Sequence, residues 1–370
     1  KRKIKSLKDT LAKQALHAEP DIVSLNPISA SDKRPYRACM LHFPQQQSLN
    51  STIAVNNSNS HSKQTLQPPN CYFILPHYFN QPQYNATLLR NEKVFLNSII
   101  LIWKRITELT HLPMPNLQSS KLNLHFDSDL CAYFHSFATS LSSAKWLLHR
   151  GVQPNALIGF GIGFLATLVL SKALDLDSAL DIILEYHENM EKGPKLQSIM
   201  INMPHYNISF LTDAHVKITC ILKENATIIS GTAEALKHFE RKVYTYYKRR
   251  FLRIIPIANY PCLQDISTQL ATKINTLTFS TPSLPLVDAN NGQHFHLPEE
   301  LNTALQEQLC QTHRPTQCFT NILEKRKPTL WLEVGQAQHF NLDTLKSLQH
   351  LFAVNCIPMF ANNVCLHDTS

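Results

Sequence analysis

The chain has 370 residues, and its composition is typical of a folded protein. Hydrophobic residues make up 44% and charged residues only 17%, so the chain can bury a sizeable core and global disorder is excluded. Lys and Arg number 35 against 27 Asp and Glu, and the net charge of +8 favours an acidic partner without identifying it. Only 8 residues are glycine, where about 7% of a chain is usual, so a cluster of glycines needs a reason in the backbone.

Neither a membrane span nor a disulfide framework is predicted. The longest uncharged apolar stretch, residues 156–170, is shorter than the roughly 20 residues of a membrane-spanning helix. The 9 cysteines never form a C-x-x-C pair, which predicts reduced thiols and a cytoplasmic location. The chain begins at Lys1 without an apolar signal region, so it is expected to be a segment of a longer polypeptide.

Residues 1–69 differ in composition from the rest of the chain. Residues 1–17 predict a short basic helix, and residues 36–43 predict a strand. Residues 44–69 are rich in Gln, Asn and Ser and poor in large apolar side chains, which predicts a disordered tether.

Residues 70–192 alternate between strand-like and helical patterns. Short apolar runs predict buried strands at 72–75 and 154–158. Apolar residues at helical spacing predict helices at 97–109, 130–148, 163–170 and 176–190. In the helix over 130–148 the apolar residues share one face.

Residues 193–257 change character. Strand-like runs surround one helix predicted over 233–248, and these strands are expected at 199–203, 216–222, 227–229 and 251–257. This alternation is typical of a small ferredoxin-like α+β unit inserted into an α/β frame.

Three of the glycines lie within the five residues G-F-G-I-G of Gly159–Gly163. The context is strand, tight turn and helix, as in a nucleophile elbow with the sequence G-x-S-x-G. Gly161 stands where that elbow carries its serine. Two alternatives remain open: a dinucleotide-binding loop, which lacks its third glycine and meets an acidic residue only at Asp175, or a turn needed only for helix–strand packing.

The neighbouring motifs resemble the malonyl-CoA:acyl carrier protein acyltransferases, the loading domains of fatty acid and polyketide synthases. In family order, they are Gly151–Gly163, Ala179-Leu180, Ile228–Gly231, Ile255–Ile257, Leu284–Leu286 with Asn291-Gly292, and Leu332–Gly335. The resemblance covers about residues 70–365. It implies an α/β-hydrolase-like large lobe over 70–192 and 258–370, with a ferredoxin-like small lobe inserted at 193–257. Residues 1–69, with Tyr36-Arg-Ala38, are similar to the linker that joins a ketosynthase to its acyltransferase.

The resemblance also implies a serine nucleophile activated by a histidine, an arginine that binds the acyl carboxylate, and an oxyanion site. None of these polar roles is kept. The corresponding positions are Gly161 for the serine, Phe160 for the preceding histidine, Cys262 or Tyr260 for the catalytic histidine, Tyr186 for the arginine, Tyr78 for the oxyanion glutamine and Leu222 for an asparagine. The pocket residues Phe160, Ile162, Gly163 and Leu222 are apolar or lack a side chain, so the pocket is expected to be filled or hydrophobic.

We therefore expect a non-catalytic acyltransferase domain, retained as a scaffold or as a docking module for acyl carrier protein. Coenzyme A thioesters and the carrier's phosphopantetheine are the ligands that the family implies, and a ketosynthase is its expected neighbour. The alternative is an active acyl carrier protein S-acyltransferase or thioester hydrolase that uses Cys262, with His205 or His215 as its base. A lone cysteine near a strand end is more often an inert apolar residue.

Two further clusters have open interpretations. The basic run Arg241–Arg253 is either the end of an amphipathic helix or a carrier-binding surface, formed by Lys242, Lys248, Arg249, Arg250 and Arg253. No nucleic-acid-binding module is recognisable, so nucleic acid is not an expected partner. The pair His294 and His296 has the spacing of two metal ligands on a strand, but it lacks a third, and a solvated pair is favoured.

Overall fold

The computed structural model divides the chain into two units, Lys1–Pro68 and Pro69–Ser370, and all described residues lie in the second. The described residues are 70–77, 89, 91–115, 117, 129–247, 254–257, 268–325, 329–335, 348 and 355–358, with only the backbone described in 254–257 and 355–358. The helix, strand and tether predicted within residues 1–69 lie outside them.

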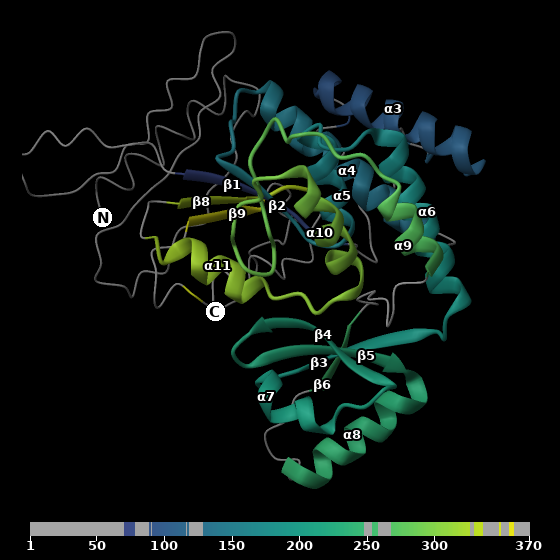
Figure 1. Ribbon diagram of the computed structural model, residues 1–370, viewed down its shortest axis with the longest axis vertical. Helices are drawn as coiled ribbons and strands as arrows, with labels where there is room; N and C mark the ends of the chain where they lie inside the picture. The colour runs from purple at the N-terminus through teal and green to yellow at the C-terminus, as the bar shows by residue number, and fades with distance from the viewer. Residues whose placement is uncertain are drawn as a thin grey trace, which may run out of the picture. The chain divides into compact units, whose positions relative to one another are not determined.

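A five-stranded parallel sheet forms the centre of the second unit (Figure 1). Its order is β7-β2-β1-β8-β9, with all described neighbours parallel. The strands are β1 (Asn70–Leu75), β2 (Ala156–Gly159), β7 (Leu286–Val287), β8 (Thr329–Glu333) and β9 (Asn355–Pro358). Since parallel strands end at the same edge, the loops after β1, β2, β7 and β8 meet there. The predicted α/β organisation is confirmed.

Helices cover both faces of this sheet, as parallel sheets require. They are α3 (Lys93–Thr110), α4 (Asp129–His149), α5 (Ile162–Leu170), α6 (Leu176–Lys192), α9 (Thr268–Asn275), α10 (Pro298–Cys310) and α11 (Pro315–Leu323). Helix α5 packs on β1 and β2, and α4 packs against α5. On the other face, Cys318 and Phe319 of α11 pack against Tyr72, Phe160 and Trp331.

Helix α4 is buried on all sides in its central part. Every residue from Ala132 to Ala144 is buried, so the helix has no solvent-facing side in this stretch. The reason is that α3, α5 and α6 all pack against it. The polar side of α4, which includes Ser142 and Ser143, therefore also lies inside the protein.

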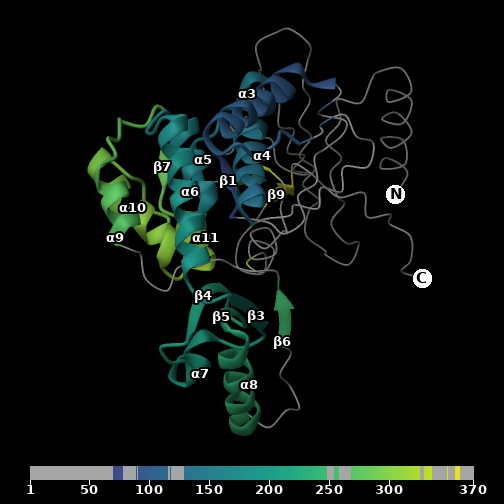
Figure 2. The same ribbon diagram turned by 90° about the vertical axis from the view of Figure 1, so that its right-hand side faces the viewer.

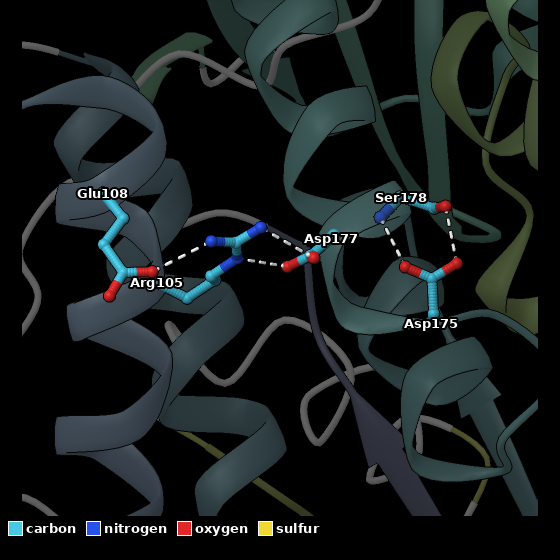
Figure 3. Close-up of polar contacts among 5 residues, drawn as sticks. All are labelled: Arg105, Glu108, Asp175, Asp177 and Ser178. Carbon is cyan, nitrogen blue, oxygen red and sulfur yellow. Dashed lines mark hydrogen bonds and ion pairs between the residues drawn. The ribbon is translucent and has the colours of Figure 1, made fainter.

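An exposed ion-pair network joins α3 to α6 (Figure 3). Arg105 donates to both carboxylate oxygens of Asp177, at 2.6 and 2.8 Å, and to Glu108 at 2.9 Å. Asp175 caps α6 by accepting from the amide and the hydroxyl of Ser178, at 2.8 and 2.6 Å. These contacts fix the start of α6 against α3.

A second sheet has four antiparallel strands in the order β4-β5-β3-β6 (Figure 2). The strands are β3 (Leu196–Ile201), β4 (Val216–Lys223), β5 (Ala226–Thr232) and β6 (Ile254–Ile257). The short helices α7 (His205–Ile208) and η1 (Ser209–Leu211) follow β3, and α8 (Ala233–Tyr247) follows β5. Both α7 and α8 lie on one face of this sheet (Figures 1 and 2). Among the described residues, no helix is long and apolar enough to cross a membrane.

Candidate functional site

The glycine cluster forms a tight turn between β2 and α5, at the carboxyl edge of the parallel sheet. The amide of Phe160 donates to the Leu75 carbonyl at 3.0 Å, and the amide of Gly163 donates to the Phe160 carbonyl at 2.8 Å. Gly161 begins α5 with φ +50° and ψ −118°, a conformation that side-chain-bearing residues rarely adopt. A Cβ at Gly163 would lie 2.2 Å from the Leu75 carbonyl oxygen, so β1 and α5 approach too closely for any other residue.

The imidazole of His77 fills the space above Gly161. Its Nδ1 lies 3.2 Å from the Ile162 amide and accepts that N–H. A Cβ at residue 161 would lie 1.8 Å from the same Nδ1. Because Nδ1 is an acceptor, a neutral ring carries its proton on Nε2. His77 is 5% exposed and follows β1 by two residues, so the sheet edge itself brings it to the turn.

Gln308 and His313 complete the surroundings of the turn. The Gly161 amide donates to Gln308 Oε1 at 3.2 Å, and His313 Nε2 lies 2.9 Å from the Gln308 carbonyl oxygen. The ring of His313 packs edge-on against His77, with centroids 5.6 Å apart, and lies 6.1 Å from Phe160. Burial lowers the pKa of His313 to about 4, so this ring is neutral near pH 7.

His313 also joins the turn to the antiparallel sheet. Its amide donates to the Thr219 carbonyl at 3.0 Å, and its carbonyl accepts from the Ile221 amide at 2.9 Å. The neighbouring hydroxyls of Thr312 and Thr316 donate to the carbonyls of Ile218 and Leu222 on the same strand, β4. The segment before α11 is therefore bridged to the edge of β4 at His313 and Cys220, while the His313 ring packs on the turn.

The structure brings only part of the predicted site together. Phe160, Ile162 and Gly163 are buried at the turn. Leu222 lies on β4, in a small cluster with Cys220, and reaches the turn only through the segment 312–316. Tyr186 is fully buried in α6, where its ring lies 5.7 Å from Tyr133 of α4.

Several predicted site residues lie outside the described part of the chain. They are Tyr78, Tyr260, Cys262, Lys248, Arg249, Arg250 and Arg253. Lys242 is described, and its ammonium lies 3.4 Å from the Asp213 carboxylate. Within the described ranges, no three His, Cys, Asp or Glu side chains group as a metal site requires, so His294 and His296 gain no further ligand there.

Sequence reasoning missed His77, Gln308 and His313. The only available signal was for His77, which stands in the loop directly after a predicted strand, beside the position assigned to the oxyanion glutamine. Cys318 lies in the same core cluster as Phe160, but burial raises the pKa of its thiol well above the usual value. It stays protonated and is not a nucleophile.

Two curated relatives are malonyl-CoA–acyl carrier protein transacylases. A malonyl CoA-acyl carrier protein transacylase of Buchnera aphidicola is 21% identical over 273 residues, 71% of this chain and 83% of that protein. The mitochondrial malonyl-CoA-acyl carrier protein transacylase of Mus musculus is 23% identical over 252 residues, 58% of this chain and 65% of that protein. The chain is therefore similar in sequence to malonyl-CoA–acyl carrier protein transacylases. No protein-family model matches it.

Larger synthases contain a similar region. The non-reducing polyketide synthase rdc1 of Metacordyceps chlamydosporia is 26% identical to this chain over 204 residues, 51% of this chain. The match covers only 9% of that synthase, so the chain corresponds to a small part of it.

Solved structures show that the chain has the fold of acyltransferase domains. The acyltransferase domain of ZmaA matches with a TM-score of 0.70 at 18% identity, covering 81% of this chain and 72% of that one. A malonyl-transacylase solved in complex with its type II polyketide synthase acyl carrier protein matches with a TM-score of 0.64 at 14% identity, covering 79% and 96%.

Proposed function

We propose that this chain is an acyltransferase-fold domain that no longer transfers acyl groups and instead binds an acyl carrier protein within a fatty acid or polyketide synthase. The observation that carries this proposal is the imidazole of His77 on the Ile162 amide, directly above Gly161. In an elbow of this type, a side-chain nucleophile attacks the acyl group, and the following amide stabilises the oxyanion. Here residue 161 has no side chain, and the following amide already has an acceptor.

The residues at the turn do not fit an acyl thioester. A carbonyl oxygen must come within about 3 Å of the amide that stabilises it, and His77 Nδ1 already lies 3.2 Å from the Ile162 amide. Loss of a triad nucleophile alone reduces the rate by about 10⁶. Coenzyme A thioesters and the carrier's phosphopantetheine are therefore proposed to form no covalent adduct at this turn.

The arrangement of the two sheets supports the proposed lobes. In chain order the antiparallel strands are β3, β4, β5 and β6, and their spatial order β4-β5-β3-β6 is that of a ferredoxin-like sheet. We assign it as the small lobe, inserted into an α/β-hydrolase-like large lobe. A ketosynthase neighbour and a linker role for residues 1–69 belong to the same proposal.

A carrier partner is supported by the structural neighbour solved with its acyl carrier protein and by the net charge of +8. This support concerns binding and is independent of the turn. A domain that binds the carrier but does not transfer acyl groups is consistent with both the support for carrier binding and the arrangement of the turn.

The test is the intact mass of the protein after incubation with malonyl-, acetyl- and long-chain acyl-coenzyme A, together with binding of a holo acyl carrier protein from a type II fatty acid synthase. We expect no mass shift in the wild type or in Gly161→Ser, because the serine cannot be placed beside His77. We expect the carrier to bind in both cases. The double variant Gly161→Ser, His77→Ala removes the obstruction and tests whether an acylatable serine can be restored.

An adduct on the wild type would overturn the proposal. If Cys262→Ala abolished that adduct, the alternative acyltransferase or thioester hydrolase with a cysteine nucleophile would replace it. Absence of carrier binding would remove the docking role and leave only a scaffold.

A further inference from the structure

Six residues of α3 are exposed, and they lie in one stripe on the side of the helix opposite its buried residues. The buried side includes Phe95, Ile99 and Ile106, and α3 packs against α4. The exposed residues recur at helical spacing: Lys93, Asn97, Ile100, Leu101, Lys104 and Glu108. We call these six residues the α3 stripe. At its centre are Ile100 and Leu101, 38% and 59% exposed, which we call the apolar pair.

The polar residues of the α3 stripe are placed symmetrically about the apolar pair. Lys93 lies seven residues before the pair, and Glu108 lies seven residues after it. Asn97 and Lys104 lie three residues before and three residues after it. A two-fold axis through the apolar pair would therefore place Lys93 opposite Glu108 of a second copy, and Asn97 opposite Lys104. Each cation of the stripe would meet an acceptor, so the stripe is complementary to itself.

The charged side chains of the α3 stripe are available for such contacts. Lys93 and Lys104 form no ion pair with another residue in the described part of the chain. Glu108 accepts from Arg105 through Oε2, at 2.9 Å, which leaves its Oε1 for a further cation. The Glu108 side chain is 47% exposed, so a lysine of a second copy can reach it.

The charges favour an antiparallel arrangement of two α3 helices. Parallel helices would place each lysine and each glutamate of the stripe beside its own equivalent, and like charges repel. Antiparallel helices also bring the positive N-terminal end of one α3 beside the negative C-terminal end of the other. Lys93 and Glu108 lie about 11 Å along the helix from the apolar pair, and at the crossing angle of about 20° that is common for such helix pairs they stay within reach of each other.

We propose that the α3 stripe is a self-association surface, through which two copies of this chain pair with their α3 helices antiparallel. The apolar pairs of both copies meet at the two-fold axis, and one ion pair between Lys93 and Glu108 forms on each side of it. This inference goes beyond the proposed function and does not depend on it. The interface is small and its ion pairs are exposed, so we expect a weak dimer with a dissociation constant of about 0.1 mM.

The composition of the α3 stripe disfavours other occupants. The stripe carries charges of both signs, which does not suit nucleic acid or a strongly acidic protein. Only the apolar pair is exposed on it, and binding in a lipid surface requires a broader apolar face. A second copy is the partner whose charges and apolar residues match those of the stripe position by position.

The experiment measures the average mass of the full chain by sedimentation equilibrium. The concentrations lie below and above the expected dissociation constant, in about 0.15 M salt, which screens the net charge of each copy. Leu101→Ser is expected to weaken association by about tenfold, because it removes an apolar side chain of each copy from the centre of the interface. Leu297→Ser is the matched control, since Leu297 is 58% exposed and lies outside α3. Unchanged melting temperatures establish that the variants fold.

Charge reversal tests the antiparallel register. Lys93→Glu and Glu108→Lys are each expected to weaken association by about tenfold, because each places two like-charged pairs in the interface. An equimolar mixture of the two variants should associate as the wild type does. In the mixed dimer the two substituted residues face each other, and the native Lys93 of one copy faces the native Glu108 of the other. Loss of the contact between Arg105 and Glu108 cannot produce this recovery, because mixing does not restore that contact.

Each outcome decides for or against the α3 stripe. An average mass that stays at that of one chain at every concentration overturns the proposal. Equal association of the wild type and Leu101→Ser overturns it, and so do equal losses in Leu101→Ser and Leu297→Ser. Association that does not recover on mixing the charge variants rejects the antiparallel pairing. Loss in Leu101→Ser together with recovery on mixing supports it.

Discussion

His77 Nδ1 lies 3.2 Å from the Ile162 amide and occupies the volume into which a side chain at residue 161 would project. The two residues come from loops that follow neighbouring parallel strands, β1 and β2, which end at the same edge of the sheet. The histidine and the glycine are therefore mutually dependent: the ring is accommodated because residue 161 has no Cβ. Any attempt to restore a nucleophile at this turn has to remove the ring as well.

Gly161→Ser is expected to destabilise the protein by roughly 2–6 kcal/mol. Part of this cost is the strain of a side-chain-bearing residue at φ +50°, and the rest is the overlap of its Cβ with the His77 ring. Urea denaturation measures the loss. Gly193→Ser is the matched control, since a Cβ there meets no atom closer than 3.6 Å, and it should stay within about 0.5 kcal/mol of the wild type. Equal stability of the two variants would show that His77 leaves room at residue 161.

His77→Ala is expected to lower the free energy of unfolding by about 2–4 kcal/mol. The variant leaves a cavity and removes the acceptor of a buried amide, that of Ile162. His77→Asn should lose less, because its side-chain oxygen can accept the same N–H. Free imidazole should raise the melting temperature of His77→Ala more than that of the wild type, since it binds only the folded cavity. A wild-type melting temperature for His77→Ala would be incompatible with this role of the ring.

The local sequence predicted the turn well and its surroundings poorly. Strand, glycine cluster and helix are consecutive in the chain, so their periodicity and the small size of the glycines were sufficient to predict Ala156–Leu170. His77 accepts from the Ile162 amide, 85 residues away in the sequence, and Gln308 accepts from the Gly161 amide, 147 residues away. Their positions depend on how strands and helices pack, which no local pattern encodes.

The burial of α4 also depends on tertiary packing. Its apolar residues have helical spacing and share one face. The remaining face carries serine, threonine and histidine, residue types that are usually exposed. They are buried because α3, α5 and α6 pack around α4. This tertiary packing outweighs the usual preference of these residue types for the surface.

The stability of the protein is expected to fall as the pH is lowered below about 6.5. Burial lowers the pKa of His135 to about 3 and that of His313 to about 4. Below pH 6.5 these two histidines bind protons in the unfolded chain but not in the folded one. The stability that these neutral histidines contribute is complete above pH 6.5. As the pH falls below 6.5, each histidine lowers the free energy of unfolding by about 1.4 kcal/mol per pH unit, until the pH reaches its folded pKa. Urea denaturation at several pH values between 7.5 and 4.5 measures this slope.

His135→Phe is expected to make this slope shallower by about one proton. Thr139→Val is the control, because it removes the contact between Thr139 Oγ1 and His135 Nε2 at 3.3 Å and keeps the titrating ring. It should leave the slope unchanged. If both variants flatten the slope equally, the hydrogen bond and not the buried ring carries the pH dependence.

Glu92→Gln is expected to lower the free energy of unfolding by about 1–3 kcal/mol, whereas Asp177→Asn should have a smaller effect. Glu92 is mostly buried and accepts from the Trp146 indole N–H at 2.8 Å and from Arg150, so it joins the start of α3 to α4. Asp177 accepts from Arg105 in the exposed network of Figure 3. Salt screens exposed charges strongly and buried ones weakly, so 1 M NaCl should remove the loss in Asp177→Asn and preserve most of the loss in Glu92→Gln. Losses that respond equally to salt would mean that solvent reaches both carboxylates to the same extent.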